Sequence, residues 1–238
     1  MKPHPSDCVA IIPARGGSKR IPDKNIRLFC GLPIIAHSIN AARESGLFSK
    51  IIVTTDSRQI ADVAIEHGAE VPFFRDEQLS GDKAGLHGVM YDALNQLKTL
   101  GFEFGYACCL LATAPLVRPE DIKRGLDALC EANAQMSLSV TTFSYCIFRA
   151  LKHDDMGKAV MIWPENLTRH SQEFPETFHD AGQFYWWDTL KFENKPSVFF
   201  SDAVPIFLPR ERVQDIDTLE DWKEAERLYL SLKTKPQS

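Results

Sequence analysis

The chain lacks a hydrophobic run long enough to cross a membrane, and it lacks an export signal. A membrane-spanning helix needs about 20 consecutive apolar residues, and no such stretch occurs in the 238-residue sequence. The N-terminal sequence MKPHPSDCVAIIPARGG has neither the apolar core nor the small-residue cleavage site of a signal peptide. We therefore expect a cytoplasmic protein with no membrane partner.

The chain also lacks an excess of positive charge and any cysteine pattern of a metal or disulfide site. Its formal net charge is −5, which argues against a nucleic-acid partner because such proteins present broadly basic surfaces. None of the 6 cysteines forms a C-x-x-C pair, and the adjacent Cys108 and Cys109 lie within the apolar run YACCLLA. We interpret the cysteines as reduced residues of the core.

Neither common phosphate-binding motif is present, yet residues 13–27 form a strongly basic loop. The sequence IIPARGGSKRIPDKN matches neither G-x-x-x-x-G-K-[ST] nor G-x-G-x-x-G. Five cations face one acid, Asp23, in this loop, which leaves a local charge of +4: Arg15, Lys19, Arg20, Lys24 and Arg27. Gly16 and Gly17 allow a sharp turn that presents backbone N–H groups. The loop is therefore either a different kind of phosphate site or a solvated surface turn.

Short apolar runs alternate with amphipathic segments, which indicates an α/β fold with a mostly parallel, Rossmann-like sheet and helices on both faces. We expect strands at residues 8–13, 50–55, 70–74, 106–112 and 136–142 and in the segments GQFYWW and AVPIFLP. Helices are predicted from Pro33 to Gly46, around residues 86–97, from Pro119 and near the C-terminus. The length suits a single domain, 1–238.

Residues 143–180 interrupt this alternation with aromatic, charged and proline residues and no helical period. We interpret this segment as an insertion of hairpin and loop, since it is too short to form a core of its own. It either folds back over a site or packs on another chain.

The basic loop resembles the signature loop of the cytidylyltransferases that activate nonulosonic acids, the group that includes CMP-sialic acid synthetase. The segments GLPIIAHSI, IIVTTDS, VPFFRDEQLSGD, ATAP, HDAGQFYWW and DIDTLEDW follow in the order found in that family. ATAP and HDAGQFYW are most similar to the pseudaminic acid branch. The loop continues with Lys24-Asn25-Ile26 where CMP-KDO synthetases usually have a Lys-Pro-Leu-like sequence. The resemblance implies transfer of CMP from CTP to the anomeric hydroxyl of a nine-carbon acidic sugar, with release of pyrophosphate.

The resemblance also implies roles for individual residues toward CTP. The basic loop would bind the triphosphate and lie near the nucleoside through Arg15, Gly16, Gly17, Ser18, Lys19, Lys24 and Asn25, with Arg15 and Lys19 also catalytic. Lys19 would hold the leaving pyrophosphate. The cytosine would be selected by Arg75, Ser80 and Asp82 in RDEQLSGD, although an ordinary polar loop remains the alternative.

A Mg²⁺ cofactor is implied, with Asp215 and Asp217 as its ligands and as catalytic residues. Both carboxylates of Asp215-Ile216-Asp217 lie on one side of an extended segment, and Mg²⁺ prefers such oxygen ligands. Spacing alone favours another role, with Asp217 as N-cap and Glu220 as its partner in a capping box. Asp56 is a weaker metal candidate, and capping of the following helix is its alternative role.

The family match places the sugar near Arg169, Gln172, Gln183, Phe184 and Tyr185. An exposed loop arginine is more often simply solvated, and the last three residues also fit a buried strand. Two departures from sialic acid enzymes, at Leu111 and Ala181, remove polar groups and favour the less polar pseudaminic acid over N-acetylneuraminic or legionaminic acid. The resemblance also implies a homodimer formed through the insertion. A nucleotide sensor without catalysis is the alternative from another class.

Overall fold

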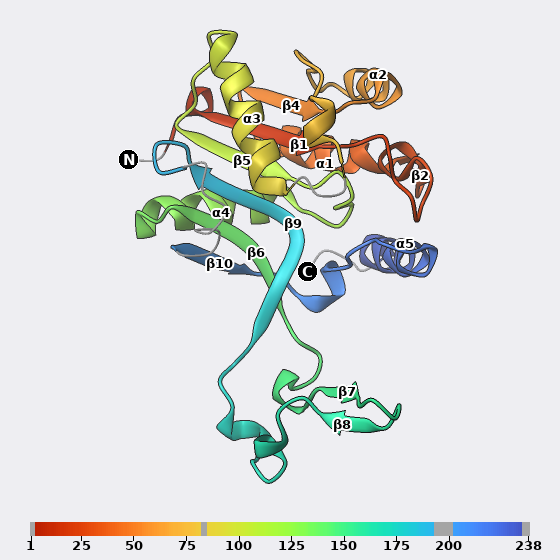
Figure 1. The fold of residues 1–238 in the computed structure, drawn as a ribbon. Helices are drawn as coiled ribbons and strands as arrows, with labels where there is room; N and C mark the ends of the chain where they lie inside the picture. Colours follow the sequence, from red (N-terminus) through yellow and green to blue (C-terminus); the bar gives the residue numbers. More distant parts are fainter. Residues whose placement is uncertain (1–2, 82–84, 193–201, 235–238) are drawn as a thin grey trace.

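A computed structural model describes residues 3–81, 85–192 and 202–234. The central sheet has the strand order β10-β6-β9-β5-β1-β4. These strands are β1 (Cys8–Pro13), β4 (Lys50–Thr54), β5 (Tyr106–Leu110), β6 (Met136–Thr142), β9 (Phe178–Asp188) and β10 (Ala203–Phe207). All are parallel except β9, which pairs antiparallel with both β5 and β6. The predicted α/β class is confirmed (Figure 1).

Helices cover both faces of this sheet. One face packs against α1 (Ile34–Ser45), α2 (Arg58–Glu66) and α4 (Pro119–Ala132) through a core that is continuous with the apolar side chains of the strands. The other face packs against α3 (Leu86–Thr99) through a second core. Pro33 precedes α1, and Gly46 ends it at φ 67°, which is a left-handed conformation that glycine adopts without strain.

A third, smaller core attaches the C-terminal helix α5 (Leu219–Thr234) to the segment that follows β1. It joins Ile21 and the short hairpin of β2 (Leu28–Phe29) and β3 (Leu32–Pro33) to the buried Ile216 and Trp222. Ile216 is fully buried there, and Asp217 beside it contacts Arg20 and Lys24 of the basic loop.

Residues 143–177 leave the sheet between β6 and β9 and form an arm that projects away from the rest of the molecule (Figure 1). The arm contains the antiparallel hairpin of β7 (Leu151–His153) and β8 (Ala159–Met161). A hairpin-and-loop insertion is therefore what the structure shows. Large apolar side chains are exposed on it, including Tyr145 at 88% and Met156 at 77%.

Two predicted local features are wrong. Residues 70–74 make only isolated bridges, Glu70 to Ile52 and Phe74 to Thr55, because Pro72 in their middle has no N–H for a continuous ladder. The capping box of α5 lies one residue later than expected. The Thr218 hydroxyl accepts from the Asp221 N–H at 3.2 Å, and the Asp221 carboxylate accepts from the Thr218 N–H at 2.7 Å.

The expectation that the cysteines are core residues holds for half of them. All six are free, and three of them are buried. Burial, with a smaller effect of the Asp7 charge, raises the pKa of Cys8 to about 12, so this thiol stays protonated near neutral pH. No described helix is long and apolar enough to cross a membrane.

Candidate active site

The cleft lies at the carboxyl end of β1, where β4 is on one side and β5 on the other. The chain runs from β1 to β4 and then returns to the opposite side of β1, and ligands of open α/β sheets bind at such a reversal. The cavity measures about 300 Å³ and is lined by the basic loop, by the start of α3 and by the turn after β5. Its lining residues are Pro13, Arg15, Ser18, Lys19, Arg20, Ile21, Lys24, Asn25, Arg75, Leu86, Val89, Leu111, Ala112, Thr113 and Asp217.

The basic loop is held in shape by its own polar contacts. The Asn25 side chain is buried and donates to the Arg15 carbonyl at 2.9 Å. The Gly16 N–H donates to Asp56 at 2.8 Å, while Ser57, rather than Asp56, caps α2. Asp56 therefore fixes the loop instead of capping a helix. The Gly16 N–H, expected to face a phosphate, is already bonded.

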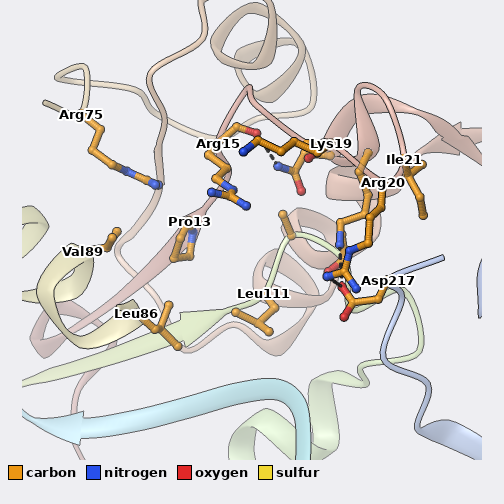
Figure 2. A pocket seen from close by; sticks show the side chains of 15 residues that line it. Pro13, Arg15, Lys19, Arg20, Ile21, Arg75, Leu86, Val89, Leu111 and Asp217 are labelled. Atoms are coloured by element: carbon orange, nitrogen blue, oxygen red, sulfur yellow. Dashed lines mark hydrogen bonds and ion pairs between the residues drawn. The ribbon is translucent and has the colours of Figure 1, made fainter. Parts of the chain in front are cut away.

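Arg15 and Lys19 both line the cavity, as Figure 2 shows. They come from one turn of the loop after β1 and bring two positive charges to a space that opens to solvent. A polyphosphate in this cleft would be neutralised by both side chains. Both cations therefore lie at the cleft, and their contact with a triphosphate stays a prediction.

Asp217 lies at the opposite side of the cleft and is contacted by cations of the same loop. Its carboxylate is 2.9 Å from the Arg20 guanidinium and 3.5 Å from Lys24 Nζ. Lys24 also donates to the Ile216 carbonyl at 2.7 Å. Lys24 therefore ties the aspartate segment to the basic loop, in addition to lining the cavity.

Asp215 and Asp217 interact electrostatically across the buried Ile216. Burial and the neighbouring charge of Asp217 both raise the pKa of Asp215, and Lys24 partly opposes this rise. Carboxylate oxygens are suitable ligands for a hard divalent cation, although only Asp217 of the two lines the cavity. Among the described residues no three His, Cys, Asp or Glu side chains gather around one point, so a cation here would need further oxygens from substrate or water.

Arg75 lies at the other end of the cavity and points into it (Figure 2). Only 7% of the residue is exposed, and burial lowers the pKa of its guanidinium. Nε donates to the Thr54 hydroxyl at 3.3 Å, and Nη2 donates to the Thr54 carbonyl. Ser80 does not line the cavity, and its hydroxyl donates to the Asp76 carbonyl at 2.9 Å. Asp82 lies outside the described residues.

The residues predicted to bind the sugar lie in two separate parts of the chain, the arm and β9. Arg169 and Gln172 lie on the exposed arm, away from the cleft. Arg169 is held there by a contact of 4.5 Å over the Phe174 ring and a hydrogen bond of 3.1 Å to the Glu173 carbonyl. Its position is therefore fixed by local packing rather than by the cavity.

The three predicted sugar residues of β9 are mostly structural in this chain. Phe184 is fully buried against α4, where it cannot contact a ligand, so this assignment is wrong. Gln183 is also buried and donates to the Arg212 carbonyl, although its Oε1 has no partner among the described residues. The Tyr185 hydroxyl donates to Asp180 at 2.6 Å, and burial raises the pKa of this phenol.

Comparison with known proteins agrees with the site. A profile described as "Cytidylyltransferase" matches residues 9–176. The chain belongs to the cytidylyltransferase family. It is 36% identical over 221 residues to a pseudaminic acid cytidylyltransferase of Campylobacter jejuni, covering 93% of this chain and 95% of that one. It is 34% identical over 224 residues to a CMP-N,N'-diacetyllegionaminic acid synthase of Legionella pneumophila, covering 92% and 95%.

The fold is also that of a solved cytidylyltransferase. A CMP:2-keto-3-deoxy-manno-octonic acid synthetase, determined in complex with CTP, superposes with a TM-score of 0.69 at 14% identity. The match covers 94% of this chain and 99% of that one. At this identity the likeness supports the fold alone, and the fold agrees with the family assignment.

Proposed function

We propose that this enzyme transfers CMP from CTP to the anomeric hydroxyl of pseudaminic acid, producing CMP-pseudaminic acid and pyrophosphate. The observation that carries the proposal is the cleft itself, where Arg15 and Lys19 face Asp217 at the carboxyl end of β1. The names of the Campylobacter relatives, at 36% identity, support the sugar. The apolar Leu111 at the cleft agrees with the less polar acceptor.

In this reaction the sugar oxygen forms a bond to the α-phosphorus of CTP, and the bond from that phosphorus to the bridging oxygen of pyrophosphate breaks. Arg15 binds the triphosphate, and Lys19 neutralises the leaving pyrophosphate. Arg75 donates hydrogen bonds to the acceptor atoms of cytosine. The rate enhancement comes mainly from positioning and charge neutralisation, as is usual for phosphoryl transfer.

A Mg²⁺ ion would be held by Asp215 and Asp217, because carboxylate oxygen is its preferred ligand and the raised pKa of Asp215 shows a carboxylate that a further cation would stabilise. When bound, Mg²⁺ supplies neutralisation of phosphate charge. Arg20 and Lys24 contact Asp217 from the loop side and keep the aspartate segment beside the triphosphate site.

The first experiment is pyrophosphate release with CTP and Mg²⁺, using pseudaminic acid, N-acetylneuraminic acid, a legionaminic acid and KDO as separate acceptors. Selective turnover with pseudaminic acid supports the proposal. Preference for another acceptor overturns the sugar and leaves the family unaffected. No release with any acceptor, despite measurable CTP binding, would favour a nucleotide sensor.

We also propose that the enzyme is a homodimer in which the arm of one subunit supplies Arg169 and Gln172 to the sugar end of the other subunit's cleft. The exposed apolar side chains of the arm support this arrangement, as does the way in which the arm projects from the rest of the molecule (Figure 1).

A substitution of Leu167, which is 72% exposed on the arm, tests the dimer. Leu167→Glu is expected to weaken dimerisation in light scattering, whereas Ile65→Glu on α2 is the control.

Mixing two inactive variants tests the sharing of residues. Arg169→Ala removes the charge of Arg169 from the arm and leaves the cleft intact. Asp217→Asn changes the cleft and leaves the arm intact. A mixed dimer contains one site with both intact parts, so activity is expected to recover in part. A mixture that stays inactive, with subunit exchange verified, would place Arg169 outside the shared site.

A further inference from the structure

A carboxylate oxygen of α3 is buried without a hydrogen-bond partner. Asp92 Oδ2 is inaccessible to solvent and has no partner among the described residues. Leaving a buried polar group unpaired destabilises the folded state. Such groups are uncommon in folded proteins and call for an explanation. The fold alone gives no reason for an aspartate at this position.

Asp92 is close enough to Arg75 for their charges to interact. Burial raises the pKa of Asp92, and the positive charge of Arg75 opposes this rise. Asp92 in turn stabilises the charged form of the buried Arg75 guanidinium, together with Asp56. Asp92 lies one helical turn beyond Val89, which lines the cavity beside Arg75. Asp92 therefore lies on the helix that lines the cavity near Arg75.

The guanidinium of Arg75 is fixed on one edge only. Nε and Nη2 donate to Thr54, and no hydrogen bond of Nη1 is found among the residues that the structure describes. Asp92 forms no direct ion pair with Arg75. The charge of Asp92 therefore acts on the Arg75 guanidinium from beyond hydrogen-bond distance. A nucleobase in the cleft would meet a cationic donor whose charge is favoured by Asp92.

The donor edge of Arg75 matches the chemical difference between cytosine and uracil. Cytosine presents acceptors at O2 and N3 and an amino donor at C4, whereas uracil presents an N3–H donor and a carbonyl at C4. An Arg75 N–H can donate to N3 of cytosine, but it would meet the N3–H donor of uracil without a hydrogen bond. We propose that Asp92 is a positioning residue for base selection: it orients the free edge of Arg75 and favours CTP over UTP. This inference rests on the proposed role of Arg75 in binding the base.

The test measures kcat and KM of Asp92→Asn with CTP and with UTP, using the whole 238-residue chain. The Asn side chain has the same shape without the charge. KM for CTP is expected to rise on the order of 10-fold with kcat nearly unchanged, and the CTP to UTP ratio of kcat/KM is expected to fall. The melting temperature should not fall, because the raised pKa of Asp92 means that ionisation of this carboxyl costs stability in the folded state. Asp62→Asn, in an exposed pair with Arg58 on α2, is the matched control.

Two further variants separate the possible failures. Asp92→Glu keeps the charge and should retain more of the CTP preference than Asp92→Asn, which also tests the proposal if the Asn variant does not fold. Arg75→Lys should raise KM for CTP. If Arg75→Lys changes KM but Asp92→Asn leaves KM and the nucleotide ratio unchanged, this inference is wrong and the role of Arg75 stands. If Arg75→Lys has no effect, the proposed role of Arg75 fails and the inference fails with it. A fall in melting temperature with equal losses for both nucleotides would show a purely structural role for Asp92.

Discussion

Gly125 in α4 packs against two rings of β9 so closely that no side chain fits. A Cβ atom placed there would lie 2.8 Å from Phe184 Cε2 and 2.8 Å from Trp186 Cδ1. Both rings are fully buried, and the Trp186 indole N–H donates to the Ile122 carbonyl at 2.9 Å. Neither ring can therefore move without disturbing the core or breaking this hydrogen bond.

Gly125→Ala is expected to destabilise the protein even though alanine is the better helix former. Alanine gains about 1 kcal/mol of helix propensity over glycine. Overpacking a rigid core costs about 1–3 kcal/mol, and loss of the indole hydrogen bond costs about 1 kcal/mol more. The net effect should be a loss of about 1–3 kcal/mol in the free energy of unfolding, measured by equilibrium urea denaturation.

Gly88 in α3 provides the matched control. A Cβ there would meet only Leu79 Cδ2, at 3.9 Å, which is an ordinary contact. Gly88→Ala should therefore gain about 0.5–1 kcal/mol from helix propensity. Opposite signs for the two substitutions, with unchanged m values, support the packing argument. If Gly125→Ala were as stable as the wild type, the close packing of α4 on β9 would be refuted.

Three other substitutions have definite expected outcomes. Asp215→Asn should reduce turnover by a factor on the order of 100 or more without reducing stability at pH 7, measured by steady-state kinetics and thermal melting. The pKa of Asp215 is raised, so ionisation of its carboxyl costs stability of the folded state above that pKa. The uncharged Asn side chain removes this cost. A lower melting temperature of Asp215→Asn would contradict this expectation. Lys24→Met should move the acid limb of the kcat/KM profile to higher pH, because Lys24 lowers the pKa of Asp215; an unmoved limb counts against Asp215 as the titrating group. Asp121→Ala should cost about 3–5 kcal/mol in chemical denaturation, since it leaves the buried Arg212 guanidinium without its ion-pair partner.

The local elements of the fold could be predicted from the sequence because each has a clear physical signal. The apolar run of β1 has the same bounds in the sequence and in the structure, and Pro119 marks the first residue of α4. The antiparallel placement of β9 between β5 and β6 was not foreseen. No local pattern in β9 specifies its neighbours, since strand order is set by packing between distant segments.

The site was predictable in part for the same reason. Arg15, Lys19 and Asp217 line one cleft, as the charge pattern and the family resemblance required. Phe184 was misplaced because one strand alternates between two faces, and the sequence does not say which face meets the cleft. Asp92 gave no signal at all, since a single acid in an amphipathic helix normally faces solvent.

Apolar residues, rather than the polar ones, assemble the two sides of the cleft. Ile21 from the basic loop and Ile216 from the aspartate segment are both buried in the small core against α5. Each isoleucine lies next to a charged residue that the cleft uses, Arg20 beside Ile21 and Asp217 beside Ile216, and these two charges meet at 2.9 Å. That exposed ion pair contributes little free energy by itself, whereas burial of two isoleucines contributes several kcal/mol in all. The geometry of the charges at the cleft is therefore a consequence of hydrophobic packing, and α5 contributes to it although none of its described side chains lines the cavity.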